Sequence, residues 1–395
     1  MAIRNVLFVI DRELSSNSGI HVHSLANGLS QLGMDCAVVA PGGKRSASEL
    51  GAVLYRAVEL GKATQMDRVF PNGAGPDIVH GWTPRETVRK FCDGLRERFR
   101  FKLFVHLEDN EDYLLEKLYP ARPAATITEA ENVPDSVSHP ARYRAFLRRA
   151  SGATVIIEKL KEFVPDGVPS LTLWPGVDTG MFYPRPANPE LARELNLPLN
   201  GATIVYTGNV HPANAAEVRS LYLAVAMLNR EGHSTHLVRT GQDHCLFLAD
   251  DGQWVKPYLR ELGVAPRKQM PEILALADVF VQPGRVDNFN EYRFPSKLPE
   301  FLAMGKPVIL PAANIARAMV SGRDAWVLDE ADGPQITEAV KRIRQDAELH
   351  ARLSEGALEF ARTRLSWPTQ AAKLKEFYLE RANHSSAAFS PSFPK

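Results

Sequence analysis

The sequence predicts an α/β fold of two doubly wound domains, each a parallel sheet covered by helices, and three observations predict it. The chain has 395 residues, which is more than one simple hydrophobic core organises. In both halves, short apolar runs alternate with stretches whose apolar residues recur three to four positions apart. The apolar runs are hydrophobic almost throughout, which is typical of strands that are buried on both faces.

The first half predicts a strand at its beginning and a helix directly after it. "NVLFVI" predicts the strand, and "HVHSLANGLSQLG" predicts the helix, which ends at Gly33. Further strands are predicted at "DCAVVAP", "PDIVHGW" and "FKLFVHLED", with a helix at "RETVRKFCDGLRERF", and the run "ATVIIEKLKEFV" follows. Between Ala121 and Arg142 the pattern is weak, and this segment is either a lid over a site or an insertion.

The second half repeats the alternation. Strands are predicted at "ATIVYTGNV" and "STHLVRTG", with the helix "AAEVRSLYLAVAMLNREG" between them, and "MPEILALADVFVQPG" predicts a helix and then a strand. Pro299 is tolerated only in the first turn of a helix, so the next helix begins near Pro295 or Ser296 and ends at Gly305. A strand at "DAWVLDEA" and a charged helical tail complete the pattern.

The predicted organisation follows from this alternation. We expect an N-terminal domain at residues 1–184, a linker at 185–198, a C-terminal domain at 199–365, a helix at 366–383 that crosses back to the first domain, and a flexible tail at 384–395. The boundary is placed where Pro and Gly are frequent. Ligands of open parallel sheets bind at the carboxyl ends of the strands, so the candidate site residues are those that follow the predicted strands.

Composition excludes several classes of function. Lys and Arg total 47 against 46 for Asp and Glu, so no overall charge attracts nucleic acid, and we expect no nucleic-acid partner. The three cysteines (Cys36, Cys92 and Cys245) lie far apart, which argues against a disulfide framework or a zinc site and fits a reducing cytoplasm. No apolar run approaches the length of a membrane span, and "VLFVI" is too short for a signal peptide.

Two cations and a carboxylate surround the start of the predicted helix in "EYRFPSKLPEFLAMGKPVIL". The free backbone donors of its first turn lie beside Lys297, with Arg293 just before it, and this combination predicts an anion site. Glu300 lies one turn further on the same side as Lys297, where a carboxylate can accept two hydrogen bonds from a vicinal diol such as a ribose. The alternative interpretation is a surface ion pair between Lys297 and Glu300.

At this point the sequence resembles a known family. "FPSKLPEFLAMGKPVI" resembles the donor-site signature of GT-B glycosyltransferases, in particular the retaining family 4 (glycosyltransferase group 1) enzymes. "WPGVDTGMFYP" is similar to their interdomain element, with Pro175 where Asn is usual, and "IVYTGNV" and "ADVFVQPG" are similar to their donor-domain strands. The resemblance implies a GT-B architecture, in which an acceptor-binding and a nucleotide-sugar-binding Rossmann-like domain face a cleft.

The resemblance also implies roles for residues of the second domain. Glu300 would bind the nucleotide ribose, and Lys297 with Arg293 the diphosphate. The family's first acid, which contacts the donor sugar, is matched by Glu291 only after a shift of one place. The turn after "IVYTG" lacks the basic residues of many relatives, so the predicted donor-binding set also includes residues of this turn and of a later strand, namely Gly208, Asn209 and Arg239. A structural ion pair is the alternative for Arg239.

In the first domain, the resemblance places Gly19, after Ser18, close to the donor phosphate, where a missing Cβ is useful. His106 ends a predicted strand and is the predicted catalytic histidine beside the donor sugar; a satisfied strand-end histidine is the alternative. The predicted acceptor contacts are Trp82, Arg85 and Asp109, with packing as the alternative for Trp82 and Arg85. His21 and His23 are interpreted as surface positions of the first helix.

These assignments predict a hexosyltransferase-type enzyme. It would move a sugar from a nucleotide-diphosphate sugar to a hydroxyl of a glycan, lipid-linked or protein acceptor, with retention, in the synthesis of cell-surface polysaccharide or glycoconjugate. No DxD motif follows a strand, so cations are expected to stabilise the leaving diphosphate without a metal, and no cofactor is expected. The alternatives are a GT-B-like sugar-nucleotide epimerase and an inactive GT-B-like binding protein. A dehydrogenase is disfavoured because "DRELSSNSGI" lacks GxGxxG.

Two basic stretches bear on location. "RETVRKFCDGLRERFRFK" carries seven Lys or Arg against three acids, and "RYRAFLRRA" adds four arginines. These are either solvated helix faces or a surface that rests on anionic lipid. We therefore expect a cytoplasmic protein, with peripheral contact at the inner face of the membrane as the alternative.

Overall fold

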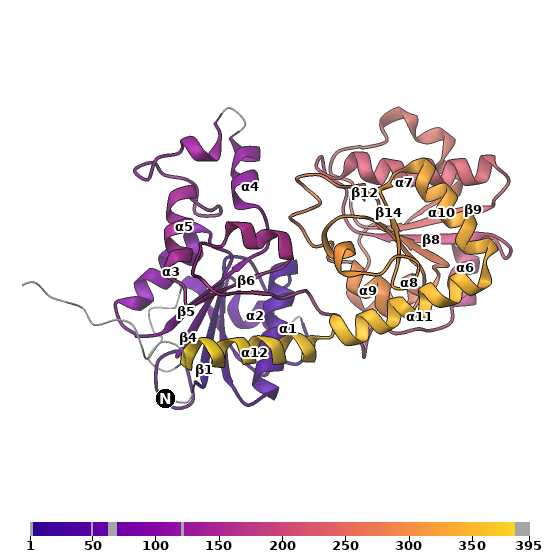
Figure 1. Ribbon diagram of the computed structural model, residues 1–395. Coiled ribbons are helices and arrows are strands. Elements are labelled where there is room, and N and C mark those ends of the chain that lie inside the picture. Colours follow the sequence, from indigo (N-terminus) through magenta and orange to yellow (C-terminus); the bar gives the residue numbers. More distant parts are fainter. Residues whose placement is uncertain (1–2, 49, 62–68, 120–121, 384–395) are drawn as a thin grey trace, which may run out of the picture. The chain divides into compact units, whose positions relative to one another are not determined.

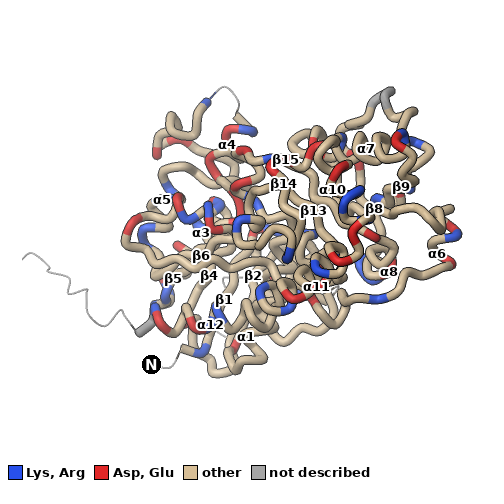
Figure 2. Tube along the Cα trace, turned by 45° about the vertical axis from the view of Figure 1, so that its right-hand side comes forward, with Lys and Arg blue, Asp and Glu red and all other residues tan. Residues whose placement is uncertain are grey.

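The computed structural model describes residues 3–48, 50–61, 69–119 and 122–383, and the chain divides into two compact units (Figure 1). The first unit consists of Met1–Pro175 and Trp367–Lys395, and the second of Gly176–Ser366. The tail predicted at residues 384–395 lies outside the described residues. Lys and Arg are interspersed with Asp and Glu along the chain (Figure 2), and their totals of 47 and 46 nearly balance.

The first unit contains a seven-stranded sheet in the order β3-β2-β1-β4-β5-β6-β7, and all of its strand pairs are parallel. The strands are β1 Asn5–Ile10, β2 Asp35–Ala40, β3 Arg56–Glu59, β4 Ile78–Trp82, β5 Lys102–Leu107, β6 Gly152–Val155 and β7 Ser170–Thr172. Every residue of β1 and β4 is buried, which explains why these strands are mostly apolar, with Asn5 and His80 as their polar residues. The predicted parallel α/β sheet is confirmed.

Helices pack on this sheet. They are α1 Asn17–Gln31, α2 Gly43–Ser48, α3 Glu86–Arg96, α4 Glu111–Leu118, α5 Pro140–Arg148 and α12 Trp367–Asn383. The last helix, α12, lies along α1 (Figure 1) and belongs to the first unit although the whole second unit precedes it in the sequence. A Cβ on Gly28 of α1 would lie 2.6 Å from Cβ of Ala371 on α12, so the two helices approach closely at a glycine.

The weakly patterned segment contains a short 3-10 helix, Ala124–Thr126, between α4 and α5. Leu115 of α4, Ala124 and Val137 form a small hydrophobic cluster there. Through this cluster, Ala124 and Val137 of the segment pack against Leu115 in the C-terminal half of α4.

The second unit contains a six-stranded parallel sheet in the order β10-β9-β8-β11-β13-β14, and a separate antiparallel pair, β12 with β15. The strands are β8 Ala202–Thr207, β9 Thr235–Thr240, β10 Leu259–Glu261, β11 Val279–Val281, β12 Gly284–Arg285, β13 Val308–Pro311, β14 Trp326–Leu328 and β15 Glu330–Ala331. Its helices are α6 Pro189–Glu194, α7 Ala215–Arg230, α8 Met270–Ala275, α9 Leu298–Ala303, α10 Gly333–Gln345 and α11 Ala347–Arg364. Helix α7 packs on α10, and α9 packs on α11.

The division between the units differs from the predicted domain boundaries. It falls after Pro175, and Val177 N donates to Leu365 O at 2.7 Å, which ties the start of the second unit to its end. The predicted linker, residues 185–198, lies inside the second unit and contains α6. The segment between the halves also contributes β7 to the first sheet, because Ser170–Thr172 pairs with β6.

The order of the strands locates a candidate site in each unit. Strand order reverses between β1 and β4 in the first sheet and between β8 and β11 in the second. Ligands of such sheets bind where the carboxyl ends of the two strands diverge. Asp11 follows β1, Thr83 follows β4, and Gly208 follows β8, so these are the positions around which each site is built.

The predicted short helix is α9. It begins at Leu298, with Lys297 as its N-cap residue, two to three positions later than the sequence predicts, because Pro295 and Leu298 form a turn first (N to O 3.0 Å). It ends before Gly305, whose φ of +63° is the left-handed conformation that favours glycine.

Candidate active site

In the second unit, Lys297 lies against the end of β8. Its Nζ lies 3.9 Å from the centroid of the Tyr206 ring, a cation–π contact. A Cβ on Gly208 would lie 3.3 Å from both Cε and Nζ of Lys297, and Gly208 has φ +125°. Glycine at this position therefore provides both the backbone conformation and the space for the lysine. We call Tyr206, Gly208, Lys297, Arg293 and Glu217 the Lys297 cluster.

The electrostatic state of Lys297 is unusual for a lysine. Burial first, and then the nearby charge of Arg293, lower its pKa to about 7, and Glu217 opposes both effects. A bound anion would favour the charged ammonium, because an opposite charge raises the pKa of a base. The cluster is thus electrostatically suited to a phosphorylated ligand.

Arg293 is fixed by its neighbours beside Lys297. Its Nη2 lies 3.0 Å from Glu217 Oε2 and 2.7 Å from Asn290 Oδ1, and its guanidinium stacks 4.0 Å from the centroid of the Phe289 ring. Burial raises the pKa of Glu217, and Arg293 opposes this rise. A guanidinium held in this way is preorganised, so little side-chain entropy is lost when it binds an anion.

Glu300 and Glu291, the two predicted carboxylates, are each paired with an arginine. Arg267 Nη1 donates to Glu300 Oε1 at 3.0 Å, while burial raises the pKa of Glu300 and Arg267 opposes the rise. Glu291 accepts two hydrogen bonds from Arg317, at 3.1 Å from Nε and 2.7 Å from Nη2. Glu300 lies in the first turn of α9 and is partly exposed, whereas Glu291 is buried.

The structure does not bring every predicted donor residue into the Lys297 cluster. Arg239 on β9 is buried and donates from Nε to Glu261 at 3.0 Å, so it forms the ion pair that was its alternative interpretation. Asn209 accepts a hydrogen bond at its Oδ1 from Gln242 N at 2.8 Å, and its carbonyl accepts one from the side chain of Asn214 at 3.1 Å. These contacts shape the turn after β8.

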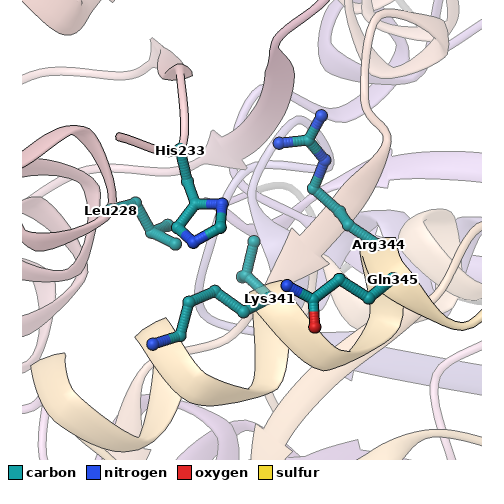
Figure 3. Close-up of a pocket in the computed structure, with 6 residues that line it drawn as sticks. Leu228, His233, Lys341, Arg344 and Gln345 are labelled. Carbon is teal, nitrogen blue, oxygen red and sulfur yellow. The ribbon is translucent and has the colours of Figure 1, made fainter. Parts of the chain in front are cut away.

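A pocket of about 210 Å³ lies elsewhere in the second unit (Figure 3). It is lined by Leu228 of α7, by His233, and by residues of α10 that include Lys341. His233 precedes β9, so the pocket lies at the amino ends of the strands, away from the Lys297 cluster. Lys341 Nζ lies 2.7 Å from Glu231 Oε2 and also pairs with Glu338, so its charge is already neutralised.

In the first unit, Glu108 connects three elements and was not among the predicted site residues. It follows β5 and accepts hydrogen bonds from Trp82 Nε1 at 2.8 Å and from Ser18 Oγ, while His21 Nδ1 lies 3.5 Å from its Oε1. Although burial opposes ionisation, the hydrogen bond and charge of His21 hold the pKa of Glu108 at about 2. Only the three-dimensional arrangement reveals this carboxylate, because its partners lie far away in the sequence.

His106 and Trp82 lie deeper than predicted. Both are buried, with 0% and 1% of their surface exposed, and their rings stack with centroids 3.8 Å apart. Burial lowers the pKa of His106 to about 3, and its Nε2 has no hydrogen-bond partner among the described residues. Contact of His106 with a ligand would require a neighbouring side chain to move, and Trp82 packs on His106 instead of facing an open acceptor site.

Arg85 lies among acids at the point where β1 and β4 diverge. Its guanidinium nitrogens lie 3.3 Å from Asp11, 3.8 Å from Asp109 and 4.0 Å from Glu111. Burial raises the pKa of Glu111 to about 7; Arg85 opposes the rise and Asp109 adds to it. Asp109 is 38% exposed, so the predicted acceptor residues Arg85 and Asp109 do lie together, in acidic surroundings.

The first loop and helix differ from expectation in two ways. A Cβ on Gly19 would lie 2.4 Å from Glu13 O and from Leu14 Cα, so this glycine allows the helix to approach its own preceding loop. The interpretation of His21 and His23 as surface residues is wrong, since they are only 7% and 8% exposed. His23 Nδ1 lies 2.9 Å from Tyr55 Oη, which gives this histidine a polar partner inside the unit.

The described residues contain neither a membrane-spanning helix nor a group of metal ligands. None of the described helices combines the length and hydropathy that crossing a membrane requires. Among the same residues, no three His, Cys, Asp or Glu side chains come together as metal ligands do.

Comparison with known sequences matches part of the second unit to a family model. Residues 201–346 match the family model of the glycosyl transferases group 1. The D-inositol 3-phosphate glycosyltransferase of Thermobispora bispora is 25% identical over 221 residues, which cover 52% of this chain and 49% of that protein. The corresponding enzyme of Stackebrandtia nassauensis is 29% identical over 220 residues, with 52% and 47% covered. The chain thus spans about half the length of the curated relatives that it matches.

Comparison with solved structures covers both units. Sucrose-phosphate synthase from Thermosynechococcus elongatus matches 97% of this chain and 100% of its own, with a TM-score of 0.68 and 14% identity. HepE of Anabaena, solved in complex with UDP-glucose, matches 95% of this chain and 99% of its own, with a TM-score of 0.68 and 13% identity. A glycosyltransferase from Rickettsia africae matches 98% and 100%, with a TM-score of 0.70 and 14% identity. By the fold of its two units the chain has the GT-B architecture, and its residues 201–346 match the family model of the glycosyl transferases group 1.

Proposed function

We propose that this protein is a glycosyltransferase that moves a sugar from a nucleotide-diphosphate sugar to a hydroxyl acceptor. The observation that carries the proposal is the Lys297 cluster. It places one fixed guanidinium and one readily charged ammonium at the carboxyl end of β8, where the strand order of the second sheet reverses. This is the point at which a nucleotide diphosphate binds in a doubly wound sheet. HepE was solved with UDP-glucose, so uridine diphosphate sugars are the first donors to test.

The cluster also supports transfer without a metal. Glycosyl transfer requires that the negative charge developing on the leaving diphosphate be stabilised. Lys297 and Arg293 supply positive charge at fixed positions, and no part of the reaction as proposed requires a divalent ion. Transfer with retention, through attack on the same face of the sugar, is proposed from the family resemblance. Activity that EDTA abolishes and Mg²⁺ restores would contradict metal independence.

For the ribose we propose Glu300. Its carboxylate is partly exposed and is held by Arg267 alone among the described residues. A ribose diol could replace or share this contact, because a carboxylate accepts several hydrogen bonds. Glu291 is a weaker candidate for the donor sugar, since both of its oxygens accept from Arg317.

The acids around Arg85 support a neutral acceptor. Asp11, Asp109 and Glu111 surround one guanidinium, and this surplus of negative charge disfavours a phosphorylated acceptor. A sugar or other polyhydroxylated acceptor fits such surroundings, because carboxylates accept hydrogen bonds from hydroxyl groups.

We place the reaction in polysaccharide or glycoconjugate synthesis in the cytoplasm.

Membrane contact is the less favoured location. The basic stretch around α3 is partly neutralised within the unit: Arg89 pairs with Glu86 at 2.6 Å and with Asp93 at 2.8 Å, and Arg149 also pairs with Asp93 at 2.8 Å. Figure 2 shows both signs of charge around α3 and α5. Such paired faces are typical of solvated helices.

The experiment that tests the function is a thermal-shift screen against nucleotide-diphosphate sugars, followed by transfer assays with neutral sugar acceptors. A donor at about 100 times its dissociation constant stabilises the folded state by about 2.7 kcal/mol, which is readily measured. Lys297→Ala is expected to abolish the shift, whereas Lys256→Ala, at an exposed position of the same unit, is expected to retain it. An unchanged shift in Lys297→Ala would overturn the proposal.

Two other functions share the fold. An epimerase would convert the donor without any acceptor, and incubation with the donor alone would reveal the product. An inactive binding protein is favoured by one observation, the pairing of both predicted carboxylates with arginines. Donor binding without turnover against any acceptor would support that function instead.

A further inference from the structure

A series of buried polar side chains connects α12 to His106 within the first unit. Tyr378 Oη of α12 lies 2.7 Å from Nδ1 of His80 on β4. Nε2 of His80 lies 3.0 Å from Oγ1 of Thr154 on β6, and the same hydroxyl lies 2.7 Å from Nδ1 of His106 on β5. All four side chains are 0% exposed. We call these four residues the buried relay.

The hydroxyl of Tyr378 sets the direction of the hydrogen bonds. Burial raises the pKa of this hydroxyl, so it keeps its proton, and among the described residues its hydrogen-bond partner is His80. It therefore donates to Nδ1 of His80. Burial, and then the neighbouring His106, lower the pKa of His80, so this ring is neutral and carries its own proton on Nε2. Nε2 of His80 therefore donates a hydrogen bond to Oγ1 of Thr154.

The remaining step defines the tautomer of His106. The oxygen of Thr154 accepts from His80, so its own proton is donated to Nδ1 of His106. Because burial lowers the pKa of His106 to about 3, the ring is neutral at neutral pH. A neutral imidazole that accepts at Nδ1 must carry its proton on Nε2.

The opposite direction is less favourable because it leaves more groups without a partner. If His106 donated to Thr154 and Thr154 to His80, the proton of Tyr378 would have no acceptor among the described residues, and Nε2 of His106 would be an unpaired acceptor. If both rings donated to Thr154, its hydroxyl proton would be unpaired as well as Nε2. The direction that starts at Tyr378 leaves only the Nε2–H of His106 unpaired, and buried unpaired groups are costly.

We infer that Tyr378 is a positioning residue, which acts through His80 and Thr154 to hold His106 as the Nε2–H tautomer. Once the side chain that covers Nε2 has moved, this ring offers a hydrogen-bond donor to a ligand oxygen. The stacked ring of Trp82 fixes the plane of His106, and Glu108 in turn holds Trp82. As a donor, His106 can bind a hydroxyl or phosphate oxygen, and it cannot take up a proton from an acceptor. The contact with a donor sugar rests on the proposed function, whereas the tautomer does not.

Nuclear magnetic resonance of protein labelled with ¹⁵N-histidine tests the tautomer directly. Long-range proton–nitrogen correlations distinguish Nδ1–H from Nε2–H rings, and His106→Gln identifies the signals of His106. We expect the Nε2–H form in the unmodified protein and in Thr154→Ser, which keeps the hydroxyl. Tyr378→Phe and Thr154→Val are expected to shift the ring toward a mixture with the Nδ1–H form. An Nδ1–H ring in the unmodified protein would overturn the inference, whether or not any variant folds.

Tyr55→Phe is the matched control. Tyr55 is also buried and also bonds a histidine, His23, in the same unit, but it lies outside the buried relay. Its removal should leave the His106 signals unchanged. An equal effect of Tyr55→Phe and Tyr378→Phe on those signals would show a general loss of packing and would also overturn the inference.

Kinetics separates this inference from the proposed function. If the protein transfers sugar, Tyr378→Phe should lower kcat about tenfold with a smaller change in KM, because one hydrogen bond to the reacting complex is misplaced. Tyr55→Phe should be unaffected. If His106 is the Nε2–H tautomer but the protein has no transferase activity, the inference about the tautomer stands and the proposed function is wrong. If the protein is a transferase but His106 is the Nδ1–H tautomer, the proposed function stands and the inference is wrong.

Discussion

Lys297 shows how position changes the chemistry of one side chain. An exposed lysine is charged at all physiological pH values, but burial and Arg293 bring the pKa of Lys297 to about 7. The ammonium is therefore only partly formed in the free protein at neutral pH. Its neighbour Tyr206 provides an aromatic face for the charge, and Gly208 leaves the space for it.

Donor affinity should depend on pH because of Lys297. The charged form binds the diphosphate, and a bound anion raises the pKa of the lysine, so binding takes up a proton when the pH lies between the free and bound pKa values. Affinity should be greatest below about pH 7 and should fall by up to about tenfold for each pH unit above it. Calorimetry in two buffers of different ionisation heat measures the proton uptake. Lys297→Arg should remove the pH dependence of donor affinity above pH 7. If the affinity of this variant still depended on pH above 7, the dependence would belong to a titrating group other than Lys297.

Gly208→Ala should weaken donor binding more than it weakens the fold. A side chain at φ +125° is strained, and its Cβ would lie 3.3 Å from the end of Lys297. Gly232→Ala is the control, because its φ of +87° is also left-handed but nothing lies within 4 Å. Both variants should lose about 1 kcal/mol or more of stability, measured by urea denaturation, and only Gly208→Ala should lose donor affinity. Equal affinities in the two variants would contradict a role for this close approach.

At the scale of elements, the α1–α12 contact organises the first unit. Gly28 lets the two helices approach, and Leu374, Phe377 and Tyr378 of α12 are part of the hydrophobic core that β1 and α1 also form. The helix that carries Tyr378 is thus a component of the core that supports the site. A short linker helix would not bury these side chains.

Two glycine substitutions in helices should have opposite effects. Gly28→Ala would place a methyl group 2.6 Å from Cβ of Ala371, so α1 and α12 must move apart and the unit should lose about 1 to 3 kcal/mol. Gly94→Ala in α3 meets nothing within 4 Å and should gain about 0.5 to 1 kcal/mol from helix propensity. Thermal denaturation of both variants measures these changes. A stabilised Gly28→Ala protein would show that the helices do not pack as described.

At the scale of the whole molecule, the first unit is discontinuous in sequence and the second is continuous. Met1–Pro175 requires Trp367–Lys395 to complete it, whereas Gly176–Ser366 is one segment. A protein that ends at Ser366 would expose the apolar surface that Leu374, Phe377 and Tyr378 cover. The second unit would keep its own core.

Truncation should therefore affect the units unequally. In Met1–Ser366 we expect the first unit to be unfolded or to melt well below the full chain, while the second unit melts as before. Gly176–Ser366 alone should fold cooperatively. Calorimetry of the three chains resolves the transitions, and a first unit that melts unchanged without α12 would contradict its place in the core.

The sequence was sufficient for the fold, whereas the roles of the predicted site residues stay predictions. Alternating apolar runs and helical patterns predicted parallel sheets, and Lys297 with Arg293 was predicted as one anion site. The three-residue β7 was missed because it lies in a stretch rich in Pro and Gly, and periodicity needs longer segments. Contacts across the chain could not be predicted either: Arg317 reaches Glu291 from 26 positions away, and Ser18 reaches Glu108 from 90.

The place of α12 has a consequence for how the protein is made. A chain emerges from the ribosome from its N-terminus, and domains generally fold in that order. Here the first unit cannot close its core until its last helix, Trp367–Asn383, has been synthesised, whereas Gly176–Ser366 is complete before that helix emerges. The unit that begins the sequence is therefore the last to finish folding, and until then its open apolar face is the part of the nascent chain most in need of a chaperone.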